Sequence, residues 1–182
     1  MDLRELEKLS EEGKIDLFYG DQSSLSSEGY VPSGWQFPNE EVSILVEKGY
    51  KINCLALINR QNKCHWATNE ENIDALFMRN FLDDLSFKIR KDTFVVLDNA
   101  AIHHAKIIRE RMPFWQNRGL FIFFLPQYSP HLNIAESLWR IMKKNWIVPE
   151  DYLEKDSLLY AANRCLANFG TNLIIKFSKF NL

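Results

Sequence analysis

The stretch Thr93-Phe94-Val95-Val96-Leu97-Asp98-Asn99 decides the fold class of this chain. Its first five residues are apolar or β-branched without interruption, which is typical of a strand buried on both faces of a sheet. A second run of this kind, Leu120 to Leu125, is closed by Pro126. Because a predicted helix over 101–112 separates the two runs, the order of elements indicates an α/β sheet.

Before this unit, the sequence predicts a helix, a strand and a long loop. Residues 2–12 are charged and helix-forming and are stopped by Gly13, and 14–19 predict a buried strand that ends at Gly20-Asp21. Residues 22–41 are rich in Ser, Gly and Pro, so they predict a surface loop. Its expected anchors are the three aromatic residues Tyr30, Trp35 and Phe37.

Further elements complete the predicted sheet and its helices. Residues 42–57, with a turn near Lys48-Gly49, and 63–68 predict antiparallel strands. Residues 70–90 carry the apolar stripe of an amphipathic helix, and a last helix is expected near 157–168. We therefore expect an α/β domain with a five-stranded mixed sheet flanked by helices, spanning 1–182 with 1–13 as a leading helix.

Composition limits the classes of protein to which the chain can belong. The formal net charge is −2 and the pI is about 6.1, whereas domains that hold DNA tightly by themselves usually carry a basic excess. Any DNA affinity is therefore expected to come partly from elsewhere. The sequence contains no apolar run long enough to predict a membrane-spanning helix. Its three cysteines form no C-x-x-C pair, which fits a reducing compartment. These features predict a soluble intracellular protein.

Three acidic residues are the candidates for chemistry. Asp21 and Asp98 each follow a predicted strand, and ligands of open α/β sheets gather at the carboxyl ends of strands. Oxygen ligands of this kind suit the hard cations Mg²⁺ and Mn²⁺. Glu136 lies in the first turn of a helix expected to start at Asn133, so it could complete a metal site.

Each acid also has a purely structural interpretation. Asp21 and Asp98 could form ordinary turns at strand ends. Asn133-x-x-Glu136 is a capping-box pattern, and Glu136 with Arg140 could form an ion pair one turn apart. From these residue patterns alone, both interpretations stay open.

Ordered sequence blocks resemble one known family. They are IDLFYGDQSSLS with GYVPSGW, then FVVLDNAAIHHAK, and last FFLPQYSPHLNIAESLWRIMKKNW, which together lie within about 15–146. The blocks resemble the catalytic domain of mariner-like insertion-sequence transposases, in the DDE superfamily. The chain departs from the family pattern at Gln22, at His131 and at Ile134-Ala135, and none of these departures removes an acid.

The resemblance implies a fold, an activity and partners. It implies an RNase H-like fold in which Asp21, Asp98 and Glu136 are the catalytic and metal-binding residues. These residues are expected to bind two Mg²⁺ or Mn²⁺ ions as cofactors for DNA strand cleavage and strand transfer. It further implies double-stranded DNA as partner, both element ends and target, a homodimer, and a bacterial cytoplasmic, nucleoid-associated location. Family members carry a helix-turn-helix segment that this sequence lacks, so an upstream or separate one is expected. Residues expected to support the acids or contact DNA are Asn99, His103, Tyr128, Asn133, Arg140 and Lys143.

Two other functions are compatible with the same residues. The chain could be a catalytically silent transposase remnant that binds DNA or dimerises, or another metal nuclease that acts on RNA·DNA hybrids or branched DNA. His103 and His104 could equally lie on a helix surface. Cys64-His65 lacks a second ligand pair at zinc spacing, so it indicates strand packing.

Overall fold

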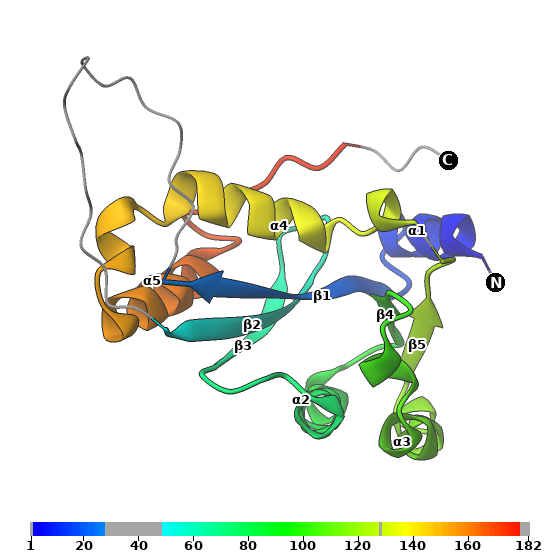
Figure 1. The fold of residues 1–182 in the computed structure, drawn as a ribbon. Coiled ribbons are helices and arrows are strands. Elements are labelled where there is room, and N and C mark those ends of the chain that lie inside the picture. Colours follow the sequence, from blue (N-terminus) through cyan, green and yellow to red (C-terminus); the bar gives the residue numbers. More distant parts are fainter. Residues whose placement is uncertain (1, 28–48, 128, 179–182) are drawn as a thin grey trace, which may run out of the picture.

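The computed structural model describes residues 2–27, 49–127 and 129–178, and its core is a five-stranded sheet in the order β3-β2-β1-β4-β5 (Figure 1). The strands are β1 (Asp16–Ser26), β2 (Lys51–Ile58), β3 (Cys64–Asn69), β4 (Thr93–Leu97) and β5 (Leu120–Phe124). The α-helices are α1 (Leu3–Glu11), α2 (Ala75–Lys88), α3 (Lys106–Gln116), α4 (Ala135–Ile141) and α5 (Lys155–Asn168). Shorter helical segments are η1 (Ala101–His104), η2 (Pro130–Leu132), the π-helix η3 (Met142–Trp146) and η4 (Pro149–Tyr152).

The sheet is mixed, as predicted. Strands β1 and β2 pair antiparallel, as do β2 and β3, whereas β1 pairs parallel with β4 and β4 with β5. Two of the three parallel strands, β4 and β5, are the uninterrupted apolar or β-branched runs of the sequence. Helices connect them across the faces of the sheet, which is the connection that parallel pairing requires. The fold class predicted from the sequence is therefore confirmed.

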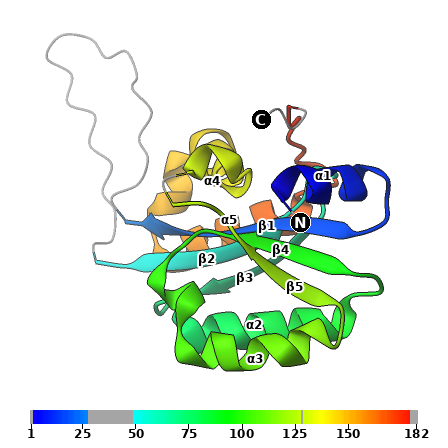
Figure 2. The same cartoon turned by 90° about the vertical axis from the view of Figure 1, so that its right-hand side faces the viewer.

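Helices cover both faces of the sheet, and each face has its own core. Figure 2 shows α2 and α3 side by side on one face, with α1 and α4 on the other. The core on the α2/α3 face includes Phe18, Val95 and Leu97, and the core on the other face includes Tyr19, Val96 and Trp139. Since side chains alternate along a strand, neighbouring residues of β1 and β4 serve opposite cores.

Strand β1 is longer than predicted, which corrects the position of Asp21. The predicted strand ends at Gly20-Asp21, whereas β1 continues to Ser26, so Asp21 lies inside the strand. Strand β4 pairs with β1 only as far as Tyr19, but β2 pairs with it up to Ser26. The ladder with β2 thus keeps polar residues extended. The predicted loop over 22–41 is wrong for its first five residues, which belong to β1. The remainder from 28 to 41, which includes the expected aromatic anchors, lies outside the described residues.

The helix predicted over 101–112 is in fact two helices. Segment η1 ends at His104, and α3 begins at Lys106 after Ala105, whose ψ of 148° is extended rather than helical. Helix α3 then runs through Pro113 to Gln116. Trp115, two residues after the proline, is fully buried in the core on the α2/α3 face.

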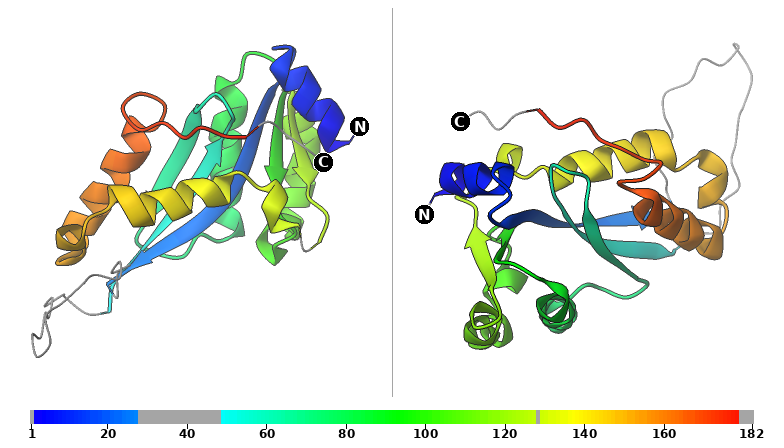
Figure 3. Two further views of the ribbon diagram at one scale, coloured as in Figure 1. Left: turned by 90° about the horizontal axis from the view of Figure 1, so that it is seen from above. Right: turned by 180° about the vertical axis from the view of Figure 1, so that it is seen from behind.

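Other predicted elements have close counterparts, and the chain end adds a new contact. Helices α2 and α5 begin and end within five residues of the predicted bounds, and β2 and β3 are an antiparallel pair as predicted. Of the predicted strand region 42–57, β2 begins only at Lys51, and 42–48 lie outside the described residues. After α5 the chain runs back toward α1 (Figure 3), where the Asn62 side chain bonds to the backbone of Ile175. No helix in the described parts of the chain has the length and apolar character needed to cross a membrane.

Candidate active site

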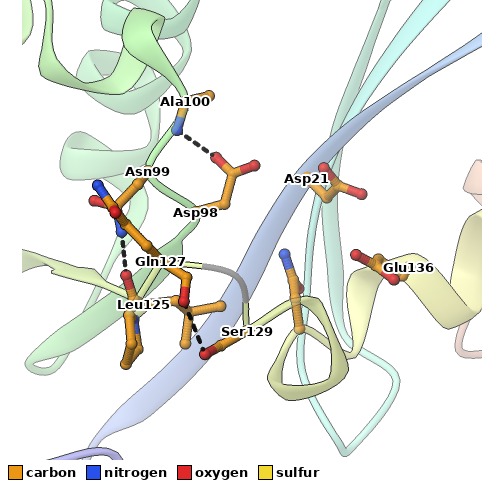
Figure 4. Close-up of a pocket in the computed structure, with 10 residues that line it drawn as sticks. Asp21, Asp98, Asn99, Ala100, Leu125, Gln127, Ser129 and Glu136 are labelled. Atoms are coloured by element: carbon orange, nitrogen blue, oxygen red, sulfur yellow. Dashed lines mark hydrogen bonds between the residues drawn. The ribbon is translucent and has the colours of Figure 1, made fainter.

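A cavity of about 330 Å³ opens where β1, β4 and α4 approach one another. Figure 4 shows Asp98, which follows β4, Asp21 of β1 and Glu136 of α4 arranged around the opening. The remaining lining residues are Asn99, Ala100, Leu125, Pro126, Gln127, Ser129 and Asn133. Three carboxylates from three separate elements therefore face one space.

Strand pairing explains why Asp21 and Asp98 lie near each other. In the parallel ladder, Tyr19 pairs with Val96, and both side chains belong to the core on the α4 face. Continuing the same register by two residues along each strand places Asp98 beside Asp21, on that same face. Because β4 ends at Leu97, the sheet opens at this point and leaves both carboxylates accessible to the cavity.

The Asp21 carboxyl group is in an environment that disfavours its negative charge. Burial, together with the negative charges of Asp98 and Glu136, raises its pKa from the ordinary value of 3.8 to about 6. The backbone N–H of Gln22 and the Trp139 side chain act in the opposite direction. A bound cation would relieve this unfavourable charge, because it would attract all three carboxylates.

Asp98 is held in its charged form by neighbouring donors. The Nδ1 atom of the buried His103 lies 2.9 Å from Asp98 Oδ1, and the Ala100 N–H donates to the same oxygen at 3.0 Å. The hydrogen bond from His103 lowers the pKa of Asp98 most, although burial opposes it. These donors occupy one oxygen, so the other can face the cavity. His103 is thus buried, not a helix-surface residue.

Asn133 fixes the start of the helix that carries Glu136. Its Nδ2 donates to the carbonyl oxygen of Gly20 at 3.0 Å, and its Oδ1 accepts from the Ala135 N–H at 3.0 Å. The helix begins one residue later than predicted, with Ile134 as its N-cap. Within the described residues, the Glu136 side chain makes neither the capping-box bond nor the ion pair with Arg140 that the sequence allowed. The first backbone N–H of the helix is instead satisfied by the Asn133 side chain.

The other residues expected to support the site have different positions. The Asn99 Nδ2 donates to the Leu125 carbonyl, and its Oδ1 accepts from His104 Nε2 at 3.0 Å, so Asn99 stiffens the cavity rim. Lys143 lies in η3, where burial lowers its pKa and the charge of Asp21 raises it. Arg140 is exposed on α4, and Tyr128 lies outside the described residues.

The donor set suits a hard divalent cation. All three acidic side chains offer oxygen atoms only, and Asn133 and Gln127 add polar groups nearby. In the described parts of the chain, no three His, Cys, Asp or Glu side chains stand close enough together to hold an ion. The acids share a cavity, and metal binding would require their carboxylates to move toward one another.

Sequence reasoning missed the role of one residue beside the site. Trp139 lies one turn after Glu136, and its indole N–H is buried without a hydrogen-bond partner among the described residues. The spacing of three residues from Glu136 was visible in the sequence. That its polar atom would lack a partner was not.

Comparison with protein families gives one match that covers most of the chain. The model of a family described as DDE superfamily endonuclease matches residues 16–159, which include all three acids. No curated protein matches the chain.

Solved structures of transposases and an integrase have a similar fold. The Mos1 strand transfer complex matches at a TM-score of 0.61 and 15% identity, covering 90% of this chain and 51% of that one. A Mos1 mariner paired-end complex with Mn matches at 0.59 and 14%, covering 92% and 56%. The catalytic core domain of BIV integrase matches at 0.52 and 12%, covering 84% and 81%. These likenesses confirm the expected RNase H-like fold, and the chain spans about half the length of the Mos1 chains.

Proposed function

The chain belongs to the DDE superfamily endonucleases, and from that premise we propose that it is the catalytic part of a transposase that cleaves DNA and joins the cut end to a target. The observation that carries the proposal is the meeting of Asp21, Asp98 and Glu136 at one cavity from three separate elements. A purely structural role for the acids would not require this meeting. The similarity to Mos1 transposase and to an integrase core supports the same reaction class.

We assign the three acids to binding two Mg²⁺ or Mn²⁺ ions. When bound, such ions would activate a water molecule and stabilise the leaving oxygen during in-line hydrolysis of a phosphodiester. The raised pKa of Asp21 supports the assignment, since crowded carboxylates are stabilised by a shared cation. The released 3′-hydroxyl would then attack target DNA at the same cavity.

Neighbouring residues would keep the acids in productive positions. His103 and the Ala100 N–H hold one oxygen of Asp98 and keep this acid ionised. Asn133 ties the helix of Glu136 to the backbone beside Asp21. These contacts come from rigid elements, so the backbone positions of the acids are set before substrate arrives, and only their carboxylates need to turn toward the ions.

DNA would approach over the exposed side of α4 and η3. Arg140 is exposed, and the half-buried Lys143 lies near Asp21, so both could contact the phosphate backbone next to the cut. The net charge of −2 leaves little general attraction for DNA. We therefore also propose that a helix-turn-helix segment, upstream or separate, reads the element ends, and that the active form is a homodimer.

Metal-dependent cleavage by the Asp98→Asn variant tests this function. We expect the variant to lose strand cleavage of element-end DNA in Mg²⁺ by roughly 1,000-fold, the scale of losing one preorganised electrostatic contact to the transition state. The substitution keeps the size of the side chain, so the fold should persist.

The matched control is Asp156→Asn, which alters an exposed acid in the first turn of α5, away from the cavity. This control should cleave like the unaltered chain. If Asp98→Asn cleaves equally well, or if cleavage proceeds without a divalent ion, the proposed mechanism is wrong.

A further inference from the structure

Trp139 has a buried polar atom that the fold itself does not use. Its side chain is 5% exposed and packs in the core of the α4 face. The indole Nε1–H is shielded from solvent and makes no hydrogen bond with any residue in the described parts of the chain. Leaving a buried donor without an acceptor costs about 1–3 kcal/mol, so native proteins rarely keep one without a reason.

The candidate acceptor for this indole N–H is the carboxylate of Asp21. Helix α4, which carries Trp139, packs against β1, which carries Asp21, and the indole is near enough to lower the pKa of the Asp21 carboxyl. No hydrogen bond between them is formed, so the two groups are close but not aligned. Helix α4 packs against β1, and Asn133 fastens its start to Gly20, the residue before Asp21. The helix therefore cannot slide freely, and a turn of the Asp21 side chain is the simpler way to complete the bond.

A second tryptophan shows what a completed bond of this kind looks like. Trp115 is also fully buried, on the opposite face of the sheet, and its Nε1–H donates to Asp83 Oδ1 at 2.7 Å. That carboxylate also accepts from Arg111, so its position is fixed by two donors. Asp21 differs because the charges of two further acids, Asp98 and Glu136, raise the pKa of its carboxyl.

We propose that Trp139 is a positioning residue for Asp21, donating its indole N–H to one carboxylate oxygen when the other oxygen binds a divalent ion. The inference rests on the proposed function, since it takes Asp21 as a metal ligand. Groups that hydrogen-bond to metal-binding side chains orient them and strengthen metal affinity. The buried donor is thus kept for the metal-bound state, in which Asp21 must be charged and fixed in direction.

The indole N–H signals in a ¹H–¹⁵N spectrum of the 182-residue chain test this directly during titration with Mg²⁺. We expect the Trp139 signal to move downfield as Mg²⁺ binds and its solvent exchange to slow, because a new hydrogen bond forms. The Trp115 signal is the internal control, since its N–H is already bonded to Asp83. In the Asp21→Asn variant the Trp139 signal should no longer respond to Mg²⁺.

Calorimetry adds a second measurement that separates positioning from folding. Trp139→Phe should weaken Mg²⁺ binding roughly 10-fold, at the lower end of the loss seen when such hydrogen bonds are removed. Trp115→Phe, which removes an indole of the same size from the other core, should leave Mg²⁺ affinity unchanged.

The possible failures are distinguishable. If Mg²⁺ binds but the Trp139 signal stays still, or Trp139→Phe binds Mg²⁺ as tightly as the unaltered chain, the positioning role is wrong and the metal site stands. If Mg²⁺ does not bind at all, the metal site is wrong, and the positioning role falls with it.

Discussion

Two acids, each next to a buried tryptophan, lie on opposite faces of the same sheet, and their surroundings differ. Asp83 accepts hydrogen bonds from Arg111 Nε at 2.8 Å and from Trp115 Nε1 at 2.7 Å. Asp21 has Trp139 nearby without a bond, and its other charged neighbours include two acids. A carboxylate whose oxygen atoms accept hydrogen bonds from the chain itself stabilises the fold. One that the chain leaves unsatisfied is available for an external ligand.

Removing each acid should have unequal consequences for the free energy of unfolding. Asp83→Ala should lower the free energy of unfolding by about 2–3 kcal/mol, because the donors of Arg111 and Trp115 lose their acceptor. Asp21→Ala in the absence of metal should change it by less than about 1 kcal/mol, since a crowded charge is removed. Urea denaturation at pH 7 measures both. Equal losses would show that the two acids do the same structural work.

A substitution at Gly20 tests how tightly the core on the α2/α3 face is packed beside the site. A Cβ at this position would lie 2.6 Å from Cδ2 of both Leu57 and Leu97, so Gly20→Ala should destabilise the fold by about 2 kcal/mol through overpacking. Gly13→Ala is the contrast, because its Cβ meets nothing within 4 Å and only its φ of +73° is unfavourable, for about 1 kcal/mol. A milder effect at Gly20 than at Gly13 would mean that the sheet yields easily there.

The pH dependence of stability should carry the signature of Asp21. Its pKa is raised from 3.8 to about 6 in the fold, so the folded chain binds more protons than the unfolded chain between these values. Stability from this group is therefore present at pH 4 and is lost as the pH rises through 6, by about 1 kcal/mol after allowing for partial exposure.

Comparing the unaltered chain with Asp21→Asn isolates this contribution, because Asp98 has a lowered pKa and contributes with the opposite sign. Saturating Mg²⁺ should reverse the trend, since it favours the ionised carboxylate. A difference between the two proteins that stays constant from pH 4 to pH 7 would contradict the raised pKa.

Local sequence patterns predicted much of the fold because they reflect burial. The uninterrupted apolar run before Asp98 reported a strand covered on both faces, and the stripe over 70–90 reported α2. The end of β1 was missed because its polar residues after Asp21 are kept extended by pairing with β2, which no local pattern reveals. The break at Ala105, where the backbone is extended between η1 and α3, was also missed.

The candidate site was predictable in its residue types but not in its environment. Three ordered blocks marked Asp21, Asp98 and Glu136, and all three line one cavity. The bond between His103 and Asp98, and the unbonded indole of Trp139, depend on distances between segments far apart in the sequence. Such distances decide which acids are satisfied, so only a structure could separate Asp21 from Asp83.

The central claim is that Asp21, Asp98 and Glu136 form one metal site, and a crystal structure of the chain soaked in Mn²⁺ tests it most directly. We expect anomalous scattering from an ion shared by Asp21 and Asp98, with Glu136 beside it and the Trp139 indole bonded to Asp21. Well-ordered acids that remain apart, with no Mn²⁺ between them, would contradict the account.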